Sequence, residues 1–160
     1  MRKILTEIKW AVIFIVMQLL WMLMEKLAGL HSEHIDKHPV YTNLIAIPSL
    51  LVYFFALNEK RKKYYGGFMT YRQGLMTGFI ITAVITVLTP LMLYITLHFI
   101  TPDFFGNAVK YAVALGKSTQ QDAEKYFSFR NYLIQSLVFT PVAGVLTSLL
   151  VSVFTRRKQN

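Results

Sequence analysis

The segment YRQGLMTGFIITAVITVLTPLMLYITLHFI, residues 71–100, decides the fold class of this chain. After Arg72 it contains no Lys, Arg, Asp or Glu, and it exceeds the roughly 20 apolar residues that an α-helix needs to cross a bilayer core. Thr70 and Gln73 have the spacing of a capping box, in which each side chain accepts the backbone N–H of the other residue. The sequence therefore predicts a membrane-spanning helix that is capped by Thr70.

Other segments have the same character, and together they predict an all-α integral membrane protein with four transmembrane helices. Of the 160 residues 54% are hydrophobic and 16% are charged, and the apolar residues form blocks of spanning length. We interpret the whole chain, 1–160, as a single membrane domain with spans at about 8–29, 41–57, 71–100 and 132–154. The second span is short, and we expect it to stand nearly upright or to thin the bilayer slightly.

The basic residues predict the orientation of these helices. Eleven of the 17 Lys and Arg residues lie at the chain start, in the 58–72 turn or in the 155–160 tail, which the alternating spans place on one side. By the positive-inside rule, both termini are then cytoplasmic. The net charge of +9 does not indicate nucleic-acid binding, because the charges flank apolar spans and do not alternate with aromatic residues on a soluble surface.

The second outer loop, residues 101–131, is expected to contain short amphipathic helices. Thr101 is a candidate cap, with Pro102 at the first helical position. One face of the following segment is apolar and consists of Phe104, Phe105, Ala108, Val109, Ala112 and Leu115. We expect this helix to lie on the outer membrane surface or over the bundle, and a second helix to begin at Ser118 or Thr119.

Three histidines fall in the first outer loop, within GLHSEHIDKHP, residues 29–39. On a helix, His31, His34 and His38 would share one face, an arrangement in which imidazoles ligate zinc or a similar divalent ion. Pro39 disfavours helical geometry at His38, and the spacing matches no specific zinc signature. Two interpretations stay open: a metal site, and a hydrated turn in which histidine is an interfacial polar residue. The chain has no Cys, which excludes thiolate ligands and disulfides.

The short basic turn after the second span is a candidate contact for anionic lipid headgroups. Its four consecutive basic residues are Lys60, Arg61, Lys62 and Lys63. Such clusters beside a span attract acidic lipid, and they also fix the topology without any further role. Both interpretations are compatible with the sequence.

Small residues on two spans predict close helix packing. Gly74 and Gly78 are four residues apart on the third span, and Gly144, Ser148 and Ser152 form a seam on the fourth. The contact would lie within one chain or between two copies. Within the first span, Gln18 is expected to be an interhelical hydrogen-bond partner.

Three prolines lie at similar depth in the spans. Pro48, Pro90 and Pro141 each remove a backbone donor and are able to kink their helices. Kinks at one level would flare the outer half of the bundle into a cavity. The alternative is that the shared depth is a coincidence, since proline is common in membrane helices.

Several stretches resemble a known family. They are MTYRQGLMTGFIITAVITVLTP, ITPDFF and FSFRNYLIQSLVFTPVAGVLTSLLVSVFTRRK, and more weakly HSEHIDKHPVYTNLIAIPSLLVYFFAL. In these the chain is similar to small Bacteroidota membrane proteins known as domain of unknown function 4199. The resemblance implies a four-helix protein of the bacterial inner (cytoplasmic) membrane, and it supplies no functional residues.

The sequence favours a non-enzymatic protein. It contains no Gly-rich phosphate loop, no nucleophile elbow and no pair of acids at catalytic spacing, and no cofactor is expected apart from the divalent ion considered above. The leading hypothesis is an accessory or scaffold protein that binds itself, lipid or a partner membrane protein. The alternative is a small oligomeric transporter or channel for a cation or small solute, with a histidine-containing outer entry.

Overall fold

The computed structural model describes residues 4–158, which form helices joined by short turns. Within this part of the chain, four helical segments are long and apolar enough to cross a membrane. They are Leu5–Leu27, His38–Lys63, Tyr71–Ile100 and Phe129–Thr155. The four-span, all-α membrane fold predicted from the sequence is confirmed.

Two of the spans are built from more than one helical element. The second contains α2 (His38–Tyr41), the 3-10 turn η1 (Thr42–Ile45) and α3 (Ala46–Lys63). The third contains α4 (Tyr71–Ile95) and the π-helical turn η2 (Thr96–Ile100). The first and fourth are single helices, α1 (Leu5–Leu27) and α7 (Phe129–Thr155).

The second span is longer than the 41–57 expected from hydropathy. The helix continues through the charged residues to Lys63 and gives a span of 26 residues. Basic side chains in its last turn complement the negative end of the helix dipole, so the charge extends the helix instead of ending it. A span of this length crosses a bilayer without thinning it.

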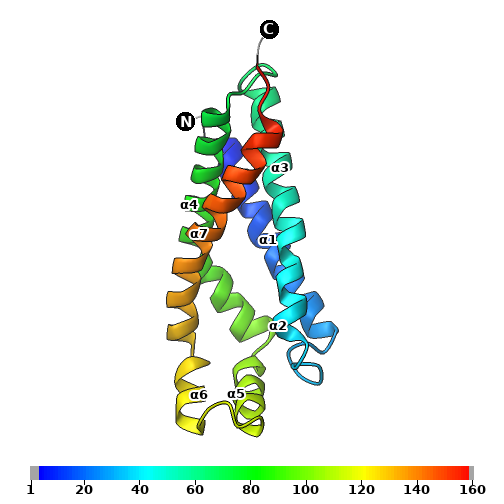
Figure 1. Cartoon of the computed structure of the whole chain (residues 1–160), viewed down its shortest axis with the longest axis vertical. Coiled ribbons are helices and arrows are strands. Elements are labelled where there is room, and N and C mark those ends of the chain that lie inside the picture. Colours follow the sequence, from blue (N-terminus) through cyan, green and yellow to red (C-terminus); the bar gives the residue numbers. More distant parts are fainter. Residues whose placement is uncertain (1–3, 159–160) are drawn as a thin grey trace.

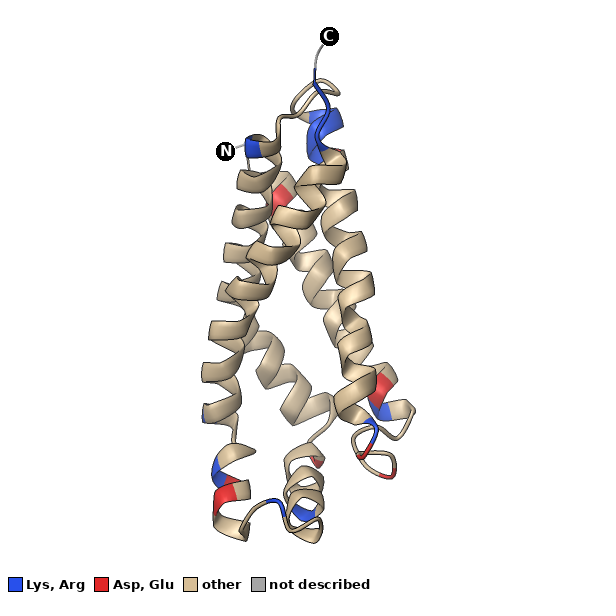
Figure 2. Ribbon diagram, in the orientation of Figure 1, with Lys and Arg blue, Asp and Glu red and all other residues tan. Residues whose placement is uncertain are grey.

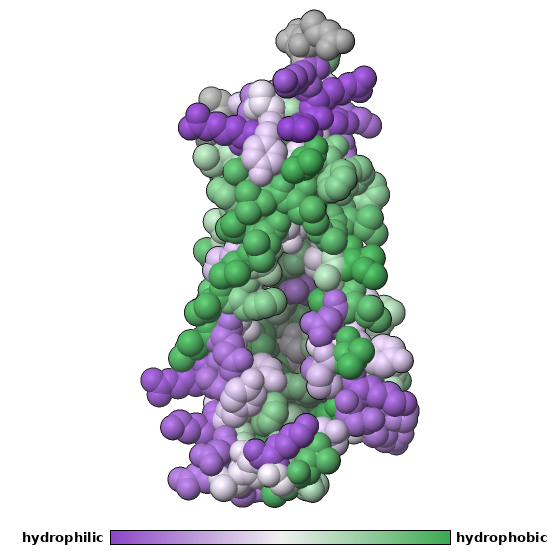
Figure 3. Space-filling model, viewed as in Figure 1, coloured by the Kyte–Doolittle hydropathy of each residue, from purple (hydrophilic) through white to green (hydrophobic). Residues whose placement is uncertain are grey.

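The four long helices run along the long axis of the molecule, with the start of α1 and the end of α7 at the same end (Figure 1). We name this the terminal end, which also holds the 64–70 turn; the opposite end, with α2 and the short helices of the 101–128 region, is the far end. Charged residues gather toward these two ends (Figure 2), and an apolar band separates them (Figure 3). This distribution is that of a multi-pass membrane protein.

The predicted seam of small residues packs α4 against α7. Gly74 lies against Ser152, and Gly78 lies against Ser148. A Cβ added to Gly78 would come within 2.6 Å of the Ser148 Cβ, so the two backbones approach each other closely. The seam is therefore used within the chain, and its buried residues are not available to a second copy.

The capping box at the start of α4 forms as predicted. The Thr70 hydroxyl accepts the Gln73 N–H at 3.3 Å, and the Gln73 side-chain oxygen accepts the Thr70 N–H at 2.8 Å. Two backbone donors that the helix start leaves unpaired are satisfied in this way.

Replacing Thr70 by alanine is expected to lower the free energy of unfolding by about 1 kcal/mol, because the N–H of Gln73 loses its acceptor. Equilibrium unfolding in mixed micelles with a rising fraction of SDS measures the difference. Thr70→Ser keeps the hydroxyl and is the matched control. An equal loss in both variants would contradict a capping role.

The 101–128 region forms the two expected short helices, α5 (Phe104–Ala114) and α6 (Gln120–Tyr126). α6 begins after Thr119, whose hydroxyl accepts the N–H of Asp122. The apolar face of α5 covers the far end of the bundle, where Phe104 packs with Leu93 and Leu97.

The predicted cap of α5 is wrong. Asp103, and not Thr101, holds the N-cap position, and its side chain makes no capping bond. Thr101 is buried, and its N–H donates to the Thr96 carbonyl at 2.8 Å. This bond closes the π-helical turn at the end of the third span, so Thr101 ends one helix instead of starting the next.

Candidate functional site

A pocket of about 350 Å³ lies in the middle of the membrane-spanning region, toward the far end. Residues of α3 and α7 form its sides, and residues of α1 and α4 lie behind it. Figure 3 shows this face of the molecule hollowed at mid-height, with hydrophilic side chains inside the recess. The lining residues are Phe14, Gln18, Asn43, Ile45, Ala46, Ser49, Leu50, Tyr53, Ile85, Phe139, Thr140, Ala143, Gly144, Leu146, Thr147 and Leu150.

The pocket extends along α7 from Phe139 to Leu150, beside the seam that packs this helix against α4. Pro48 lies in the first turns of α3 and Pro141 lies inside α7, and both are next to lining residues. Pro90, inside α4, is not next to a lining residue. The hypothesis of a cavity at the depth of the prolines therefore agrees with the positions of two of the three.

The pocket lining is apolar with a few uncharged polar groups; among the described residues that line it, none is charged. The Tyr53 hydroxyl is already paired with the Thr82 hydroxyl at 2.8 Å, and Ser49 donates to the Ile45 carbonyl. The Gln18 amide makes no hydrogen bond to any residue within 4–158. Gln18 is thus not the interhelical partner expected from the sequence, because its side chain lines the pocket.

A second polar site lies at the far end, where a carboxylate meets two imidazoles. The Glu25 Oε2 atom is 3.1 Å from His31 Nε2 and 3.5 Å from His38 Nε2. The other carboxylate oxygen accepts the indole N–H of Trp21. Glu25 and His31 are each 3% exposed, so this is a buried cluster and not a hydrated turn. We name these three residues, Glu25, His31 and His38, the Glu–His cluster.

The chain reversal after α1 brings His31 over Glu25. Gly29 has a φ of +75°, its N–H donates to the Lys26 carbonyl, and the Leu30 N–H donates to the Glu25 carbonyl. These bonds form a Schellman motif, in which glycine adopts the left-handed conformation without strain. The helix therefore ends with a turn that returns the next residues toward its own last turns.

His34 does not join the other two histidines. The 28–37 segment consists of turns and not of a helix, so the shared face on which the three-histidine set was based does not form. His34 is exposed, and its ring lies near Gly29. The candidate metal-ligating set consequently changes from three histidines to the Glu–His cluster.

Sequence reasoning missed Glu25 as a ligand, because an acid that lies next to a lysine near a helix end is generally able to reach water. The available signal was Gly29, which predicts a reversal four residues after Glu25. The Schellman motif at Gly29 returns the chain toward the last turns of α1, and this brings a histidine after the reversal close to Glu25. The burial of Glu25 depends on α5, because the Phe104 ring of this helix packs on both His31 and His38.

The four basic residues expected in a turn form the last turn of α3, and they divide into buried and exposed members. Lys60 is 3% exposed and its amine contacts the Glu7 carboxylate at 2.7 Å. This burial corrects the expectation that Lys60 faces lipid headgroups. Arg61 donates to the Thr155 carbonyl, whereas Lys62 and Lys63 are exposed and remain candidates for headgroup contact.

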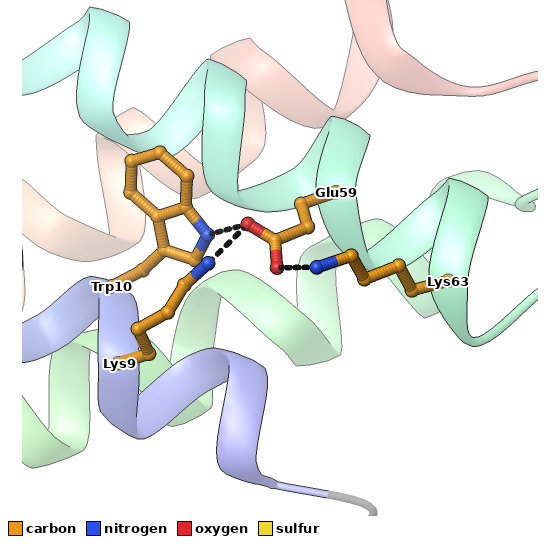
Figure 4. A network of polar contacts seen from close by, with 4 residues as sticks. All are labelled: Lys9, Trp10, Glu59 and Lys63. Atoms are coloured by element: carbon orange, nitrogen blue, oxygen red, sulfur yellow. Dashed lines mark hydrogen bonds and ion pairs between the residues drawn. The ribbon is translucent and has the colours of Figure 1, made fainter.

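A polar network ties α1 to α3 beside this buried pair (Figure 4). Glu59 accepts the indole N–H of Trp10 at 2.8 Å and contacts the amines of Lys9 and Lys63. On the turn that follows, burial raises the pKa of the Tyr65 hydroxyl, with smaller contributions from its neighbour Tyr64 and from the Glu7 carboxylate. These contacts hold the terminal end together; they do not form a ligand site.

Comparison with known proteins agrees with this architecture. No curated protein and no solved structure matches the chain. The family described as protein of unknown function (DUF4199) matches residues 9–157, which include all four spans except the first residues of α1. The resemblance found in the sequence motifs is confirmed, and the chain belongs to the DUF4199 family.

Proposed function

We propose that this protein is a non-enzymatic accessory protein of the bacterial inner membrane that binds a neutral amphipathic lipid in the pocket between α3 and α7. The observation that carries the proposal is the free Gln18 amide in an uncharged, largely apolar pocket. Gln18 is partly buried, and in an apolar pocket within the membrane an amide without a partner is unfavourable; a ligand that supplies a hydroxyl or carbonyl group removes that cost.

The dimensions and lining of the pocket support a lipid as the ligand. Small-molecule sites generally have volumes of about 300–1,000 Å³ and combine apolar walls with a few polar groups, and this pocket fits that description. The lining contains no acid or base among the described residues, which disfavours a charged headgroup or an ion. Its walls include Phe14, Leu50 and Leu146, which would contact an acyl or prenyl chain.

The orientation proposed from the charges places the pocket in the outer half of the membrane. The start of α1, the end of α7 and the basic residues 60–63 lie at one end, which the positive-inside rule assigns to the cytoplasm. A partner of the accessory protein, either a second copy or another membrane protein, would contact the lipid-facing surface, because the small-residue seam is already buried inside the chain.

Filling the pocket is expected to abolish lipid binding. Ala143 lines the pocket and the preceding residue, Val142, is 54% exposed on the lipid-facing side of the same helix. Ala143→Phe places a ring in the pocket, whereas Val142→Phe adds the same ring outside it and is the matched control. Native mass spectrometry of the protein extracted with membrane lipid should show a bound neutral lipid in the wild type and in Val142→Phe, and none in Ala143→Phe.

The Gln18 amide is tested with the apolar variant Gln18→Leu. We expect about a tenfold loss of lipid occupancy, since the polar group of the ligand is left without its partner. Equal occupancy in wild type, Ala143→Phe and Gln18→Leu would refute the pocket as the binding site. Ion or solute flux in sealed liposomes that Ala143→Phe blocks would instead favour the transporter alternative.

A further inference from the structure

We propose that the Glu–His cluster binds a divalent transition-metal ion of the zinc class at the far end of the bundle. This site goes beyond the proposed lipid binding and does not depend on it, because none of its three residues lines the pocket between α3 and α7. The ligands would be the Nε2 atoms of both imidazoles and the Oε2 atom of Glu25.

The positions of the ligand atoms match such an ion. The three candidate ligand atoms all lie within 4.8 Å of one another. In a tetrahedral zinc site with bonds of about 2.0–2.2 Å, ligand atoms are separated by roughly 3.4 Å. The carboxylate oxygen is already 3.1 Å and 3.5 Å from the two ring nitrogens. Small side-chain movements would therefore complete the coordination, with the fourth position left for water or another ligand.

The surroundings favour coordination by one carboxylate oxygen. The indole N–H of Trp21 occupies Glu25 Oε1 and leaves Oε2 directed at the imidazoles. Hydrogen bonds of this kind orient metal ligands and raise affinity. For His31, Nε2 is the ring atom that faces the carboxylate, and Nδ1 is buried without a partner among residues 4–158.

The charge of the cluster also favours a cation. Glu25 is 3% exposed near the end of a membrane span, where a carboxylate without a counter-charge is costly. Lys26 is exposed and forms no ion pair with it in the structure. A divalent ion that is bound by the carboxylate and two imidazoles supplies the compensating charge.

The scaffold draws these ligands from three connected segments and holds them in place. Glu25 belongs to the last turns of α1, His31 to the turn that follows the Schellman motif, and His38 to the start of α2. From α5, Asn107 donates to the His31 carbonyl at 2.9 Å, and the Phe104 ring lies against both imidazoles. A bound ion would fasten the first and second spans to each other and to the helix that covers them.

The test is zinc titration of the full chain in detergent micelles after treatment with a chelator and its removal. We expect one zinc ion per wild-type chain, by isothermal titration and by elemental analysis. Glu25→Gln and His38→Ala should each weaken binding by at least about 100-fold, since even the loss of an outer-shell partner costs about 10–100-fold. Trp21→Phe, which removes such a partner, should cost about 10-fold.

His34→Ala is the matched control, because this exposed histidine lies in the same turn and outside the cluster. It should bind zinc as the wild type does. Cobalt(II) gives an independent readout, since four-coordinate cobalt absorbs strongly in the visible range. His38 is partly exposed, so His38→Ala keeps the His31–Glu25 contact and the fold, which the melting temperature of the metal-free variant verifies. No stoichiometric zinc in the wild type, equal binding in all variants, or loss of binding in His34→Ala would overturn the proposal.

Discussion

Replacing Gly78 by alanine is expected to lower the free energy of unfolding by about 3 kcal/mol, at the upper end of the usual range for overpacking. The added methyl group would lie 2.6 Å from the Ser148 Cβ and 3.3 Å from the Ser148 Cα. Since a backbone atom is among the neighbours, a side-chain rotation does not relieve the contact and the two helices must separate. Equilibrium unfolding in SDS-containing mixed micelles measures the loss.

Two companion variants distinguish overpacking from a general intolerance of alanine. Gly106 lies in α5 with no atom within 4 Å of an added Cβ, so Gly106→Ala should leave stability unchanged or raise it slightly. Ser148→Gly removes the opposing side chain and should restore much of the stability that Gly78→Ala loses. If the double variant is as unstable as Gly78→Ala alone, close contact at this pair is not the cause.

The second large effect is expected at the buried ion pair between α1 and α3. Replacing Lys60 by methionine should lower the free energy of unfolding by about 3–5 kcal/mol. Glu7 is 1% exposed, so its carboxylate would lose its contact with the Lys60 amine without gaining water in return. Equilibrium unfolding in SDS-containing mixed micelles measures this loss for Lys60→Met and for the variants described below.

The double variant Glu7→Leu with Lys60→Met removes both charges and should recover most of the stability, because two apolar side chains of similar size fill the space. Lys9→Ala breaks the more exposed pair with Glu59 and should cost no more than about 1 kcal/mol. A loss in Lys9→Ala as large as in Lys60→Met would show that burial does not set the energy of these pairs.

The features predicted correctly from the sequence are those encoded by neighbouring residues. The spans follow from continuous apolar segments, and the capping box follows from the spacing of Thr70 and Gln73. The seam of small residues was also visible, since four-residue spacing places such residues on one helix face. The sequence did not show which helix packs against these residues. The choice between another helix of the same chain and a helix of a second copy depends on how the spans pack.

The features that were not predicted depend on contacts between distant segments. Lys60 and Glu7 are 53 positions apart, and their pairing converts an expected headgroup contact into a buried one. The same holds for Gln18, whose amide lines a pocket that exists because other helices diverge beside it. At the Glu–His cluster, His31 and His38 belong to the set proposed from the sequence, but the third member is a carboxylate supplied by the preceding helix instead of His34.

The close crossing of α4 and α7 also governs how the bundle would deform. Close contacts at Gly74, Gly78 and Gly144 hold the two helices together over about two turns, whereas from Gly144 toward the far end the side chains of α7 border the pocket. A small rotation of α7 relative to α4 about this contact region would move the helices little near the terminal end. The displacement would grow with distance from the contact region toward the far end. The helix crossing would therefore serve as a pivot. Displacement would be largest in the pocket and at the far end, whereas the charged terminal end would stay in place.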